Sequence, residues 1–423
     1  MANAFSFKTY YNPYISPTTN SVWGVVSVSA NDMPQQPQAT VISLICDVSG
    51  SMQGAKFNSA IATVEDLLTN APNGIMLQVV VFDDDAEELV PMTNIQPSTD
   101  RNQLLSDFRR KLRNTRMFGG TAMSTGIRMA INAQQRVPGD VARYGIFLTD
   151  GQNTEQESTL AYAVKAAADM HIHLCAYGYG RDWNPEQLTK MAQITQGWMP
   201  KAVPNPDDLR DEFNTLVVKM SQTVASDVVL HLWTPAGARI LSLAQAYPNW
   251  VKGEAAPLGD DHTWVVPVPP MSVKDHRDFV VHIELAAVGA RVVACRPSIV
   301  YASGGQRVEE KGDQATWMIL QQTNDQAQIN QVNPIVAGYL GQGQLAASTQ
   351  AMTEALNAGD MAGAERHRTE ALDIANQVGN RAMTEVLEAA GQGSEIARKT
   401  AALGTSTVSL TEEEDANKDT DQK

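Results

Sequence analysis

The sequence predicts an α/β fold, in which a doubly wound, mostly parallel sheet is inserted in a β-sandwich and followed by an α-helical C-terminal region. Residues 40–222 alternate apolar strand-like runs with amphipathic helical segments, as βα units do. Residues 225–305 change to short segments of period two between Pro, Gly and Asp turns, which is typical of a β-sandwich. Residues 314–402 show helical patterns.

The N-terminal residues 1–33 contain two alternating segments, over residues 5–10 and 21–28, with turn-forming Asn and Pro residues between them. A hairpin alone is only marginally stable in water. We therefore expect these strands to join the sandwich of residues 225–305. The domain of residues 40–222 would then be an insertion between strands of one β module.

Strands and helices alternate along the inserted domain. The apolar runs and helical stripes follow one another with the spacing of a doubly wound sheet. Strands are predicted over residues 41–46, 76–82, 144–149 and 171–179. Helices are predicted over residues 55–69, 102–113, 159–170, 185–192 and 207–222.

The first of these strands ends in a motif of alternating oxygen side chains. Asp47, Ser49 and Ser51 follow the apolar run, and the glycine between the two serines permits close approach of the backbone. Ligands of open α/β sheets bind at the carboxyl ends of strands. Hydroxyl and carboxylate oxygens with no nearby Cys or His suit a hard cation such as Mg²⁺. Taken alone, the motif is equally well explained as a Ser/Asp-rich helix cap.

Two later segments offer oxygen atoms at the same edge of the sheet. Gly119 and Gly120 form a tight backbone before an amphipathic helix, and Thr121 presents a hydroxyl there. The strand over residues 144–149 is followed directly by Asp150. The predicted metal-site residues are Asp47, Ser49, Ser51, Thr121 and Asp150.

This constellation resembles the von Willebrand factor type A (VWA) domain with a complete metal-ion-dependent adhesion site, whose pattern is Asp-x-Ser-x-Ser, a distant Thr and a distant Asp. All five positions match, and the resemblance covers under half of the chain. It implies Mg²⁺, or alternatively Mn²⁺, bound directly by Ser49, Ser51 and Thr121. Asp47 and Asp150 would act mainly through water and hydrogen bonds. It also implies that an Asp or Glu of a partner protein completes the metal shell.

The predicted rim of this site, where a partner would make contact, consists of Gly119, Gly120 and Asp84. Asp84 stands in the run Asp83-Asp84-Asp85 after the strand of residues 76–82. This run is either a second acidic rim or a solvated turn, and the latter is the more common role of a charge run.

Composition restricts the classes of partner and compartment. The net charge of −15 argues against nucleic acid, because phosphate binding needs concentrated Lys and Arg. No apolar run reaches the roughly 18 residues of a membrane span, and the start of the chain lacks a signal-peptide pattern. Cys46, Cys175 and Cys295 lie in apolar runs, as buried free thiols do in a reducing compartment. We therefore expect a cytoplasmic protein without membrane insertion.

We assign no catalytic residue and expect a non-enzymatic scaffold. Among VWA proteins the chain is most similar to the intracellular bacterial ones, whose partners include ATPases, kinases and phosphatases. One alternative is the VWA subunit of a chelatase-like or MoxR-type ATPase machine, although this chain has no phosphate-binding loop of its own. Another is an aspartate-dependent phosphatase. Such enzymes need a second Asp two positions after the first, where this chain has Ser49.

The C-terminal region is predicted to be helical and to end in a disordered tail. Helices are expected over residues 314–323, 347–358, 362–378 and 383–401. The tail of residues 405–423 is acidic and poor in apolar side chains, so it should not bury enough surface to fold.

Overall fold

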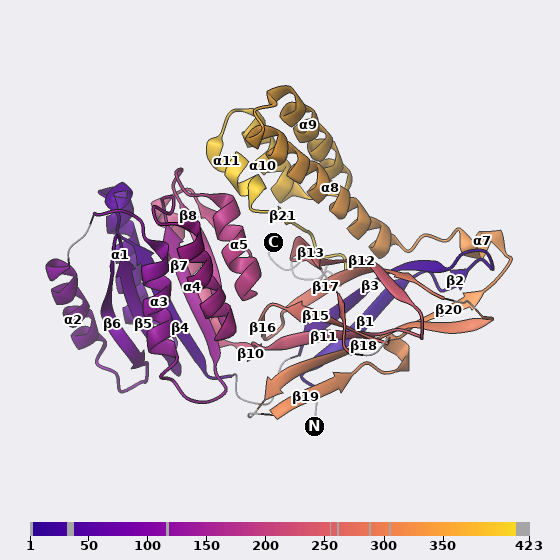
Figure 1. Ribbon diagram of the computed structural model, residues 1–423, viewed down its shortest axis with the longest axis horizontal. Coiled ribbons are helices and arrows are strands. Elements are labelled where there is room, and N and C mark those ends of the chain that lie inside the picture. The colour runs from indigo at the N-terminus through magenta and orange to yellow at the C-terminus, as the bar shows by residue number, and fades with distance from the viewer. Residues whose placement is uncertain are drawn as a thin grey trace, which may run out of the picture.

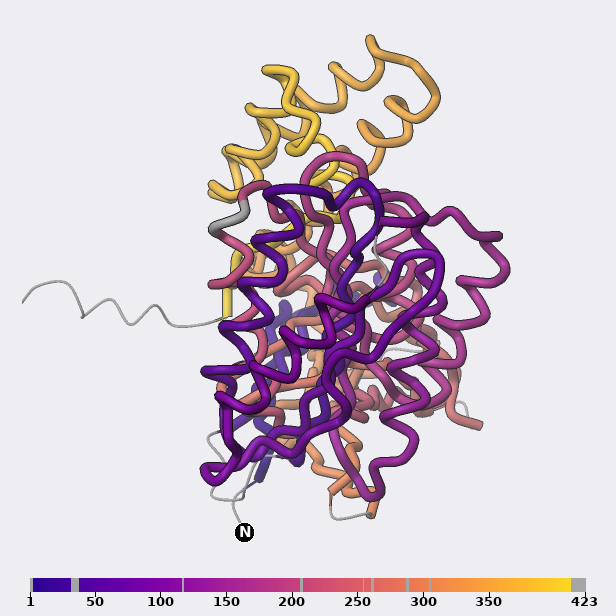
Figure 2. Tube along the Cα trace, turned by 90° about the vertical axis from the view of Figure 1, so that its left-hand side faces the viewer, coloured from indigo at the N-terminus to yellow at the C-terminus, as the bar shows by residue number. Residues whose placement is uncertain are grey.

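The chain forms three parts, namely an α/β domain, a pair of β-sheets and a helical region (Figure 1). The computed structural model describes residues 3–31, 38–115, 118–253, 255–259, 262–286, 289–303 and 306–411. In the side view of Figure 2 the helical region, coloured orange to yellow, projects above the rest of the molecule. The predicted fold class, an α/β domain with a mostly parallel sheet, further sheets and a helical C-terminal region, is confirmed.

The α/β domain is built on a six-stranded sheet in the order β6-β5-β4-β7-β8-β9. Five strands are parallel, namely β4 (Thr40–Asp47), β5 (Ile75–Phe82), β7 (Ala142–Thr149), β8 (Ile172–Tyr179) and β9 (Lys201–Val203). Every residue of β4 and β8 is buried, as the continuous apolar runs predicted. The antiparallel edge strand β6 (Ala86–Asn94) was not predicted. It is acidic and contains a proline, and only two of its side chains are buried, so its sequence carries little strand signal.

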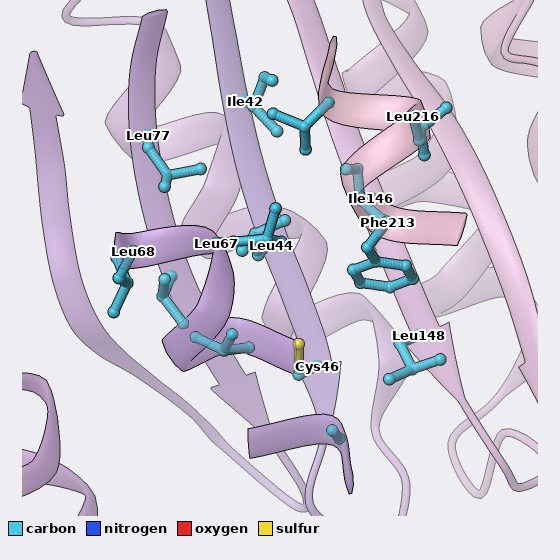
Figure 3. Close-up of a cluster of buried hydrophobic side chains, with 14 of the residues drawn as sticks. Ile42, Leu44, Cys46, Leu67, Leu68, Leu77, Ile146, Leu148, Phe213 and Leu216 are labelled. Atoms are coloured by element: carbon cyan, nitrogen blue, oxygen red, sulfur yellow. The ribbon is translucent and has the colours of Figure 1, made fainter. Parts of the chain in front are cut away.

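Helices cover both faces of this sheet. They are α1 (Ala55–Asn70), α2 (Arg101–Asn114), α3 (Met123–Gln134), α4 (Glu157–Asp169), α5 (Pro185–Thr195) and α6 (Pro206–Ser221). Helices α1, α2 and α6 share one hydrophobic core with the sheet, and α3, α4 and α5 share the other. Figure 3 shows the first core, in which Leu67 of α1 and Phe213 of α6 lie against Leu44 of β4 and Ile146 of β7.

The N-terminal strands pair with strands that follow the α/β domain. One sheet has the order β1 (Phe5–Tyr11), β3 (Ser21–Ala30), β17 (His276–Glu284), β12 (Arg239–Tyr247), β13 (Asn249–Gly253) and β21 (Thr405–Ser406). Within it Val26 of β3 lies opposite Phe279 of β17. The chain therefore leaves this β module after β3 and returns to it after α6.

The second sheet packs against the first across a common core that includes Val26, Phe279, Leu230 and Ile299. Its order is β14 (Ala256–Pro257), β15 (Thr263–Val268), β11 (Val228–Trp233), β18 (Arg291–Ser303), β20 (Met318–Gln322) and β2 (Tyr14–Ile15), and β19 (Gln306–Lys311) pairs with β18. A short ladder joins β10 (Thr223–Ala225) to β16 (Met271–Ser272). Burial alternates strictly along β11, in agreement with the period-two pattern.

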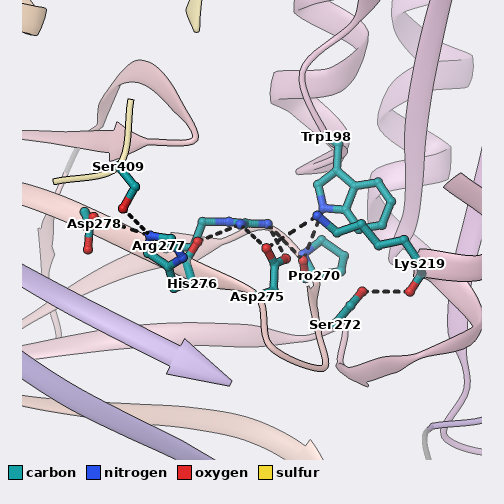
Figure 4. A network of polar contacts seen from close by, with 9 residues as sticks. All are labelled: Trp198, Lys219, Pro270, Ser272, Asp275, His276, Arg277, Asp278 and Ser409. Carbon is teal, nitrogen blue, oxygen red and sulfur yellow. Dashed lines mark hydrogen bonds and ion pairs between the residues drawn. The ribbon is translucent and has the colours of Figure 1, made fainter. Parts of the chain in front are cut away.

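Figure 4 shows the polar junction that fixes the end of α6 to the β module. Arg277 is 1% exposed and donates from Nη1 and Nη2 to the two carboxylate oxygens of Asp275, at 2.8 and 2.9 Å. Lys219 of α6 lies over the Trp198 ring and reaches Asp275 at 3.4 Å. Burial opposes the charge of Asp275, but Arg277 and Lys219 outweigh it, so the pKa of this carboxyl is lowered.

The helical region consists of α7 (Gln326–Ile329), α8 (Pro334–Asn357), α9 (Met361–Gln377), α10 (Arg381–Gly391) and α11 (Glu395–Ala402). Asn333 caps α8 by accepting hydrogen bonds from the amides of Ile335 and Val336, with Pro334 in the first turn. The predicted helix over 383–401 is interrupted between α10 and α11, where Gly393 has a φ of +92°.

The predicted helix over residues 314–323 is wrong. Gln314–Thr316 form a single 3₁₀ turn, and Met318–Gln322 form strand β20 between β18 and β2. Met318 and Leu320 are buried in the core between the two sheets, whereas Ile319 between them is only partly buried. The helix was predicted from Trp317, Ile319 and Leu320, but the buried side chains are Met318 and Leu320, which stand two positions apart as in a strand.

The predicted disorder of residues 405–423 is wrong for their first part. Thr405 pairs with Trp250 in the first sheet, the Leu410 amide donates to the Tyr339 hydroxyl at 3.0 Å, and the Thr411 hydroxyl donates to Asp278 at 2.8 Å. These partners belong to other elements, so the local sequence gives no sign of them. The acidic part of the predicted tail, residues 412–423, lies outside the described residues.

Cys46, Cys175 and Cys295 are buried and free, as predicted. No helix in the described part of the chain is long and apolar enough to cross a membrane.

Candidate metal centre

Three loops at the carboxyl edge of the α/β sheet bring the five predicted metal-site residues together. Strand β4 ends at Asp47, and its parallel neighbour β7 is followed by Asp150. The loop before α3 joins them through backbone hydrogen bonds. The Gly50 amide donates to the Gly119 carbonyl at 3.0 Å, and the Thr154 amide donates to the Thr121 carbonyl at 3.0 Å. These backbone hydrogen bonds link the three loops to one another.

Asp47 lies at the bottom of the site with no exposed surface. One carboxylate oxygen accepts the Ser49 amide at 2.8 Å, and the other accepts the Thr149 hydroxyl at 2.6 Å. Burial raises the pKa of Asp47 to about 6, although the hydrogen bonds from Ser49 and Thr149 favour the charged form. Asp47 therefore orders its own loop, and each of its two carboxylate oxygens already accepts a hydrogen bond from the protein.

Asp150 is also fully buried, and both of its oxygens have partners. Oδ1 accepts the Ser51 hydroxyl at 2.6 Å, and Oδ2 forms an ion pair with the ammonium of Lys56, the second residue of α1. Because Ser51 donates its proton to Asp150, the lone pairs of the Ser51 oxygen point away from this carboxylate.

The hydroxyls of the site converge in front of Gly151. A Cβ atom at Gly151 would lie 3.3 Å from the Ser51 oxygen and 3.4 Å from the Thr121 oxygen, so both hydroxyls face the same point. The Ser49 oxygen lies 3.1 Å from that of Ser51. Among the described residues no group of three or more His, Cys, Asp or Glu could hold a metal. A metal at this edge would therefore depend on hydroxyl ligands.

This donor set fits Mg²⁺. Ser49, Ser51 and Thr121 present neutral oxygens, and the two carboxylates stand behind them with their hydrogen bonds already made. Magnesium prefers oxygen ligands and keeps several waters, so three protein oxygens leave positions for water or an incoming ligand. Hydroxyl oxygens are ligands that favour a hard cation over a softer metal.

The predicted rim residues also lie together, but in a form that the sequence did not indicate. A Cβ atom at Gly119 would lie 2.4 Å from Asp84 Oδ2, and one at Gly120 would lie 2.4 Å from Asp84 Oδ1. The exposed Asp84 carboxylate therefore covers the two glycines. Asp83 supports the same loop, because its carboxylate accepts the Gly119 amide at 3.0 Å. The Asp83–Asp85 turn is thus packed against the loop before α3 and partly solvated.

Sequence reasoning missed the residues that hold the site residues in place. Thr149 holds Asp47, and Lys56 holds Asp150. Thr154 accepts the Thr121 amide at 3.0 Å, and Glu155 accepts both the amide and the hydroxyl of Ser124 at 2.7 Å, at the start of α3. One sequence signal pointed to Lys56, namely a basic residue in the first turn of the helix that follows the acidic motif.

Comparison with known proteins finds matches that include the part of the chain with this site. The sequence pattern of the von Willebrand factor type A domain matches residues 42–215. A solved structure described as von Willebrand factor type A from Catenulispora acidiphila is similar over 96% of this chain and 97% of its own, with a TM-score of 0.83 and 23% identity. The ArnB paralog VWA2 from Sulfolobus acidocaldarius is similar over 94% and 96%, with a TM-score of 0.58 and 14% identity. At these identities the likeness shows the fold alone.

Two curated relatives match a part of the chain. An uncharacterized protein of Synechocystis is 23% identical over 181 residues, which are 43% of this chain and 41% of that protein. The human calcium-activated chloride channel regulator 4 is 25% identical over 202 residues, which are 47% of this chain and 20% of that protein. The chain thus spans less than half the length of these relatives.

Proposed function

We propose that this chain, whose residues 42–215 form a von Willebrand factor type A domain, is a non-enzymatic scaffold that binds partner proteins through a divalent metal. Ser49, Ser51 and Thr121 would hold Mg²⁺, with Mn²⁺ as an alternative. When bound, the metal would supply a Lewis-acidic position that accepts the carboxylate of an Asp or Glu from a partner protein.

The observation that carries this proposal is the saturation of both site carboxylates by protein donors. Asp47 accepts the Ser49 amide and the Thr149 hydroxyl, and Asp150 accepts the Ser51 hydroxyl and the Lys56 ammonium. Of the five site residues, only those with neutral hydroxyls remain to bind the metal directly. Since neutral ligands compensate little of a divalent charge, the metal keeps its attraction for an external anion.

The same geometry supports a binding site over a catalytic one. Asp47 is fully buried, and both of its oxygens accept short hydrogen bonds, which makes it a poor nucleophile for a phosphatase. The residue two positions later is Ser49, whose hydroxyl is no general acid at neutral pH. The partner would be a protein of an intracellular complex, such as an ATPase, kinase or phosphatase. The three buried free thiols support a cytoplasmic location, and the net charge of −15 disfavours nucleic acid.

Calorimetry and partner capture together test the proposal. Wild type should bind one Mg²⁺ or Mn²⁺ and retain a protein from native cell extract in Mg²⁺ but not in EDTA. Thr121→Ala should lose both activities. Thr369→Ala removes an exposed threonine hydroxyl on α9 and should behave like wild type. If the same proteins were retained in EDTA and by Thr121→Ala, the metal-dependent scaffold would be ruled out.

The same experiments separate the alternatives. Capture of an ATPase ring would identify the chain as the VWA subunit of a chelatase-like or MoxR-type machine. Hydrolysis of phosphate esters that requires Mg²⁺ and is lost in Asp47→Ala would show a phosphatase, and would contradict the non-enzymatic assignment.

A further inference from the structure

Lys56 occupies an unusual position for a lysine. It is the second residue of α1, whose first turn contains no acidic residue and whose N-cap, Gly54, makes no side-chain hydrogen bond. A positive charge in the first turn of a helix faces the positive end of the helix dipole, which is unfavourable. The local structure of α1 therefore gives no reason for a lysine here, and its role lies in the tertiary contact with Asp150.

Both residues of this ion pair have surroundings that favour the contact. The Asp150 carboxylate is fully buried, whereas the Lys56 side chain is 29% exposed, so the ammonium reaches a buried anion from the solvent side. The stem of Lys56 passes Gly180, where a Cβ atom would lie 3.0 Å from Lys56 Cε and 3.2 Å from Nζ. Gly180 also has a φ of +76°, a conformation that favours glycine. The glycine in the loop after β8 thus lets the lysine side chain pass close to the backbone.

We propose that Lys56 is a built-in counter-cation of the metal centre, which balances Asp150 when the metal is absent and weakens metal binding when it is present. This inference rests on the proposed metal site. It assigns to Lys56 a positioning role, since the residue acts on the metal through Asp150 and through charge, without being a ligand.

The first part of the proposal, that Lys56 balances Asp150 when no metal is bound, follows from burial. A carboxylate that loses its only cationic partner in a buried position destabilises the fold strongly, in contrast to an exposed ion pair. Asp150 has no exposed surface, and its second partner, Ser51, is neutral. Without metal, Lys56 is therefore the group that makes a charged Asp150 compatible with the folded state.

The second part of the proposal, that Lys56 weakens metal binding, follows from repulsion between cations. A metal held by Ser49, Ser51 and Thr121 would lie next to the hydroxyl that Asp150 anchors, so the ammonium on the far oxygen of Asp150 is close enough to oppose it. With Asp47 and Asp150 ionised, Lys56 leaves the metal-loaded site with one net positive charge. That excess favours an anionic group at the open metal position, which is the chemistry of the proposed partner.

The test compares Lys56→Met, which keeps an apolar stem, with Lys56→Arg, which keeps the charge. Titration with Mg²⁺ and Mn²⁺ alone should give a Kd about tenfold lower for Lys56→Met, because one nearby positive charge is removed, and a Kd within about twofold of wild type for Lys56→Arg. Lys190→Met is the matched control, since Lys190 pairs with Glu186 on the surface of α5, and should leave the Kd unchanged.

Thermal unfolding gives a second signature, which a merely structural lysine would not show. In EDTA, Lys56→Met should melt about 5 °C below wild type, and saturating Mg²⁺ should close this gap because the metal takes over the balance of charge. If Lys56→Met folds only in the presence of Mg²⁺, the same conclusion follows. Lys56→Gln, which keeps a donor for Asp150 but no charge, should bind the metals as tightly as Lys56→Met.

Two results would overturn the inference and leave the proposed function intact. They are a Kd for Lys56→Met and Lys56→Gln that equals or exceeds that of wild type, and a melting gap of the same size in EDTA and in Mg²⁺. Failure of the proposed function has a different signature, because wild type itself would then bind neither Mg²⁺ nor Mn²⁺.

Discussion

Two aspartates, the fully buried Asp150 in the candidate metal centre and the largely buried Asp275 at the junction of α6 with the β module, are stabilised in different ways. Asp275 is held by both terminal nitrogens of the buried Arg277 and by Lys219, so it lies in a closed network (Figure 4). Asp150 is held by one hydroxyl and by a lysine that remains partly in solvent. A guanidinium in fork geometry fixes a carboxylate, whereas a lysine is a flexible point charge that is easily displaced.

The Arg277–Asp275 pair is thus a structural ion pair, whereas the Lys56–Asp150 pair is suited to exchange. The junction needs a fixed geometry, because it connects two parts of the chain that come from distant segments. The proposed metal centre would need a cation that can share its carboxylate with a divalent ion. If this distinction holds, substitutions at the two sites should differ both in the size of their effect and in their response to Mg²⁺.

Removal of the guanidinium should have the largest effect. Arg277→Met leaves the largely buried Asp275 with Lys219 as its remaining basic partner in the network of Figure 4. We expect a loss of about 3–5 kcal/mol in the free energy of unfolding, as for other broken pairs with a buried partner. Urea denaturation measures it, and the loss should be equal in Mg²⁺ and in EDTA. Arg109→Met, which breaks the exposed pair with Glu65, should lower stability far less, because solvent screens the pair. A loss at Arg277 that Mg²⁺ repaired would remove the distinction between the two sites.

Loss of the Thr149 hydroxyl, which donates to Asp47, should change the metal affinity more than the stability of the fold. Thr149→Val keeps the shape of the side chain but removes the donor to Asp47. We expect the Mg²⁺ affinity to fall about 10–100-fold, as is usual when a supporting hydrogen bond of a metal site is lost. Calorimetric titration measures the affinity, with circular dichroism as the check on folding. An unchanged affinity would mean that Asp47 needs no such support.

The two sites should respond to pH in opposite directions. The pKa of Asp47 is raised to about 6 by burial, so its folded state binds a proton more readily than the unfolded chain. In EDTA the contribution of Asp47 to the free energy of unfolding therefore falls as pH rises from about 4 to 6, and the fall is complete above that range. Asp275 has a lowered pKa, so its contribution is present above the pKa of the unfolded chain and is lost only as pH falls further.

A metal titration makes the pH effect measurable at one site. Because Mg²⁺ requires the charged form of Asp47, its Kd should be about tenfold higher at pH 5 than at pH 7.5. In Asp47→Asn the residual metal binding should lose this dependence. A wild-type Kd that stayed constant between these pH values would show that Asp47 is already ionised at pH 5.

Substitution of the rim residue Asp84 should have the smallest effect on metal affinity. Asp84 is exposed and lies over Gly119 and Gly120, and it makes no contact with the three hydroxyls among the interactions described above. Asp84→Asn should therefore change the Mg²⁺ Kd by less than about threefold, since exposed charges are strongly screened. Its effect should instead appear in the capture of the partner protein. A large change in the metal Kd would place Asp84 among the supporting groups of the metal centre.

The sequence by itself determined the parallel sheet and the five residues at its edge. Strands β4 and β8 are buried on both faces, so their apolar runs are continuous and easily recognised. Asp47 and Asp150 directly follow such runs, and the ends of parallel strands must share one edge. Their convergence is therefore a consequence of local pattern and topology, which a sequence displays.

Tertiary structure alone decided the features that depend on a distant partner. Met318 and Leu320 fit either a helix or a strand until β18 and β2 are placed beside them. Leu410 and Thr411 are ordered by side chains of α8 and β17, although their own segment resembles a disordered tail. The pairing of Lys56 with Asp150 likewise joins residues far apart in the chain. Periodicity reports which face of an element is buried, but the partner of a polar group is fixed only when the whole chain has folded.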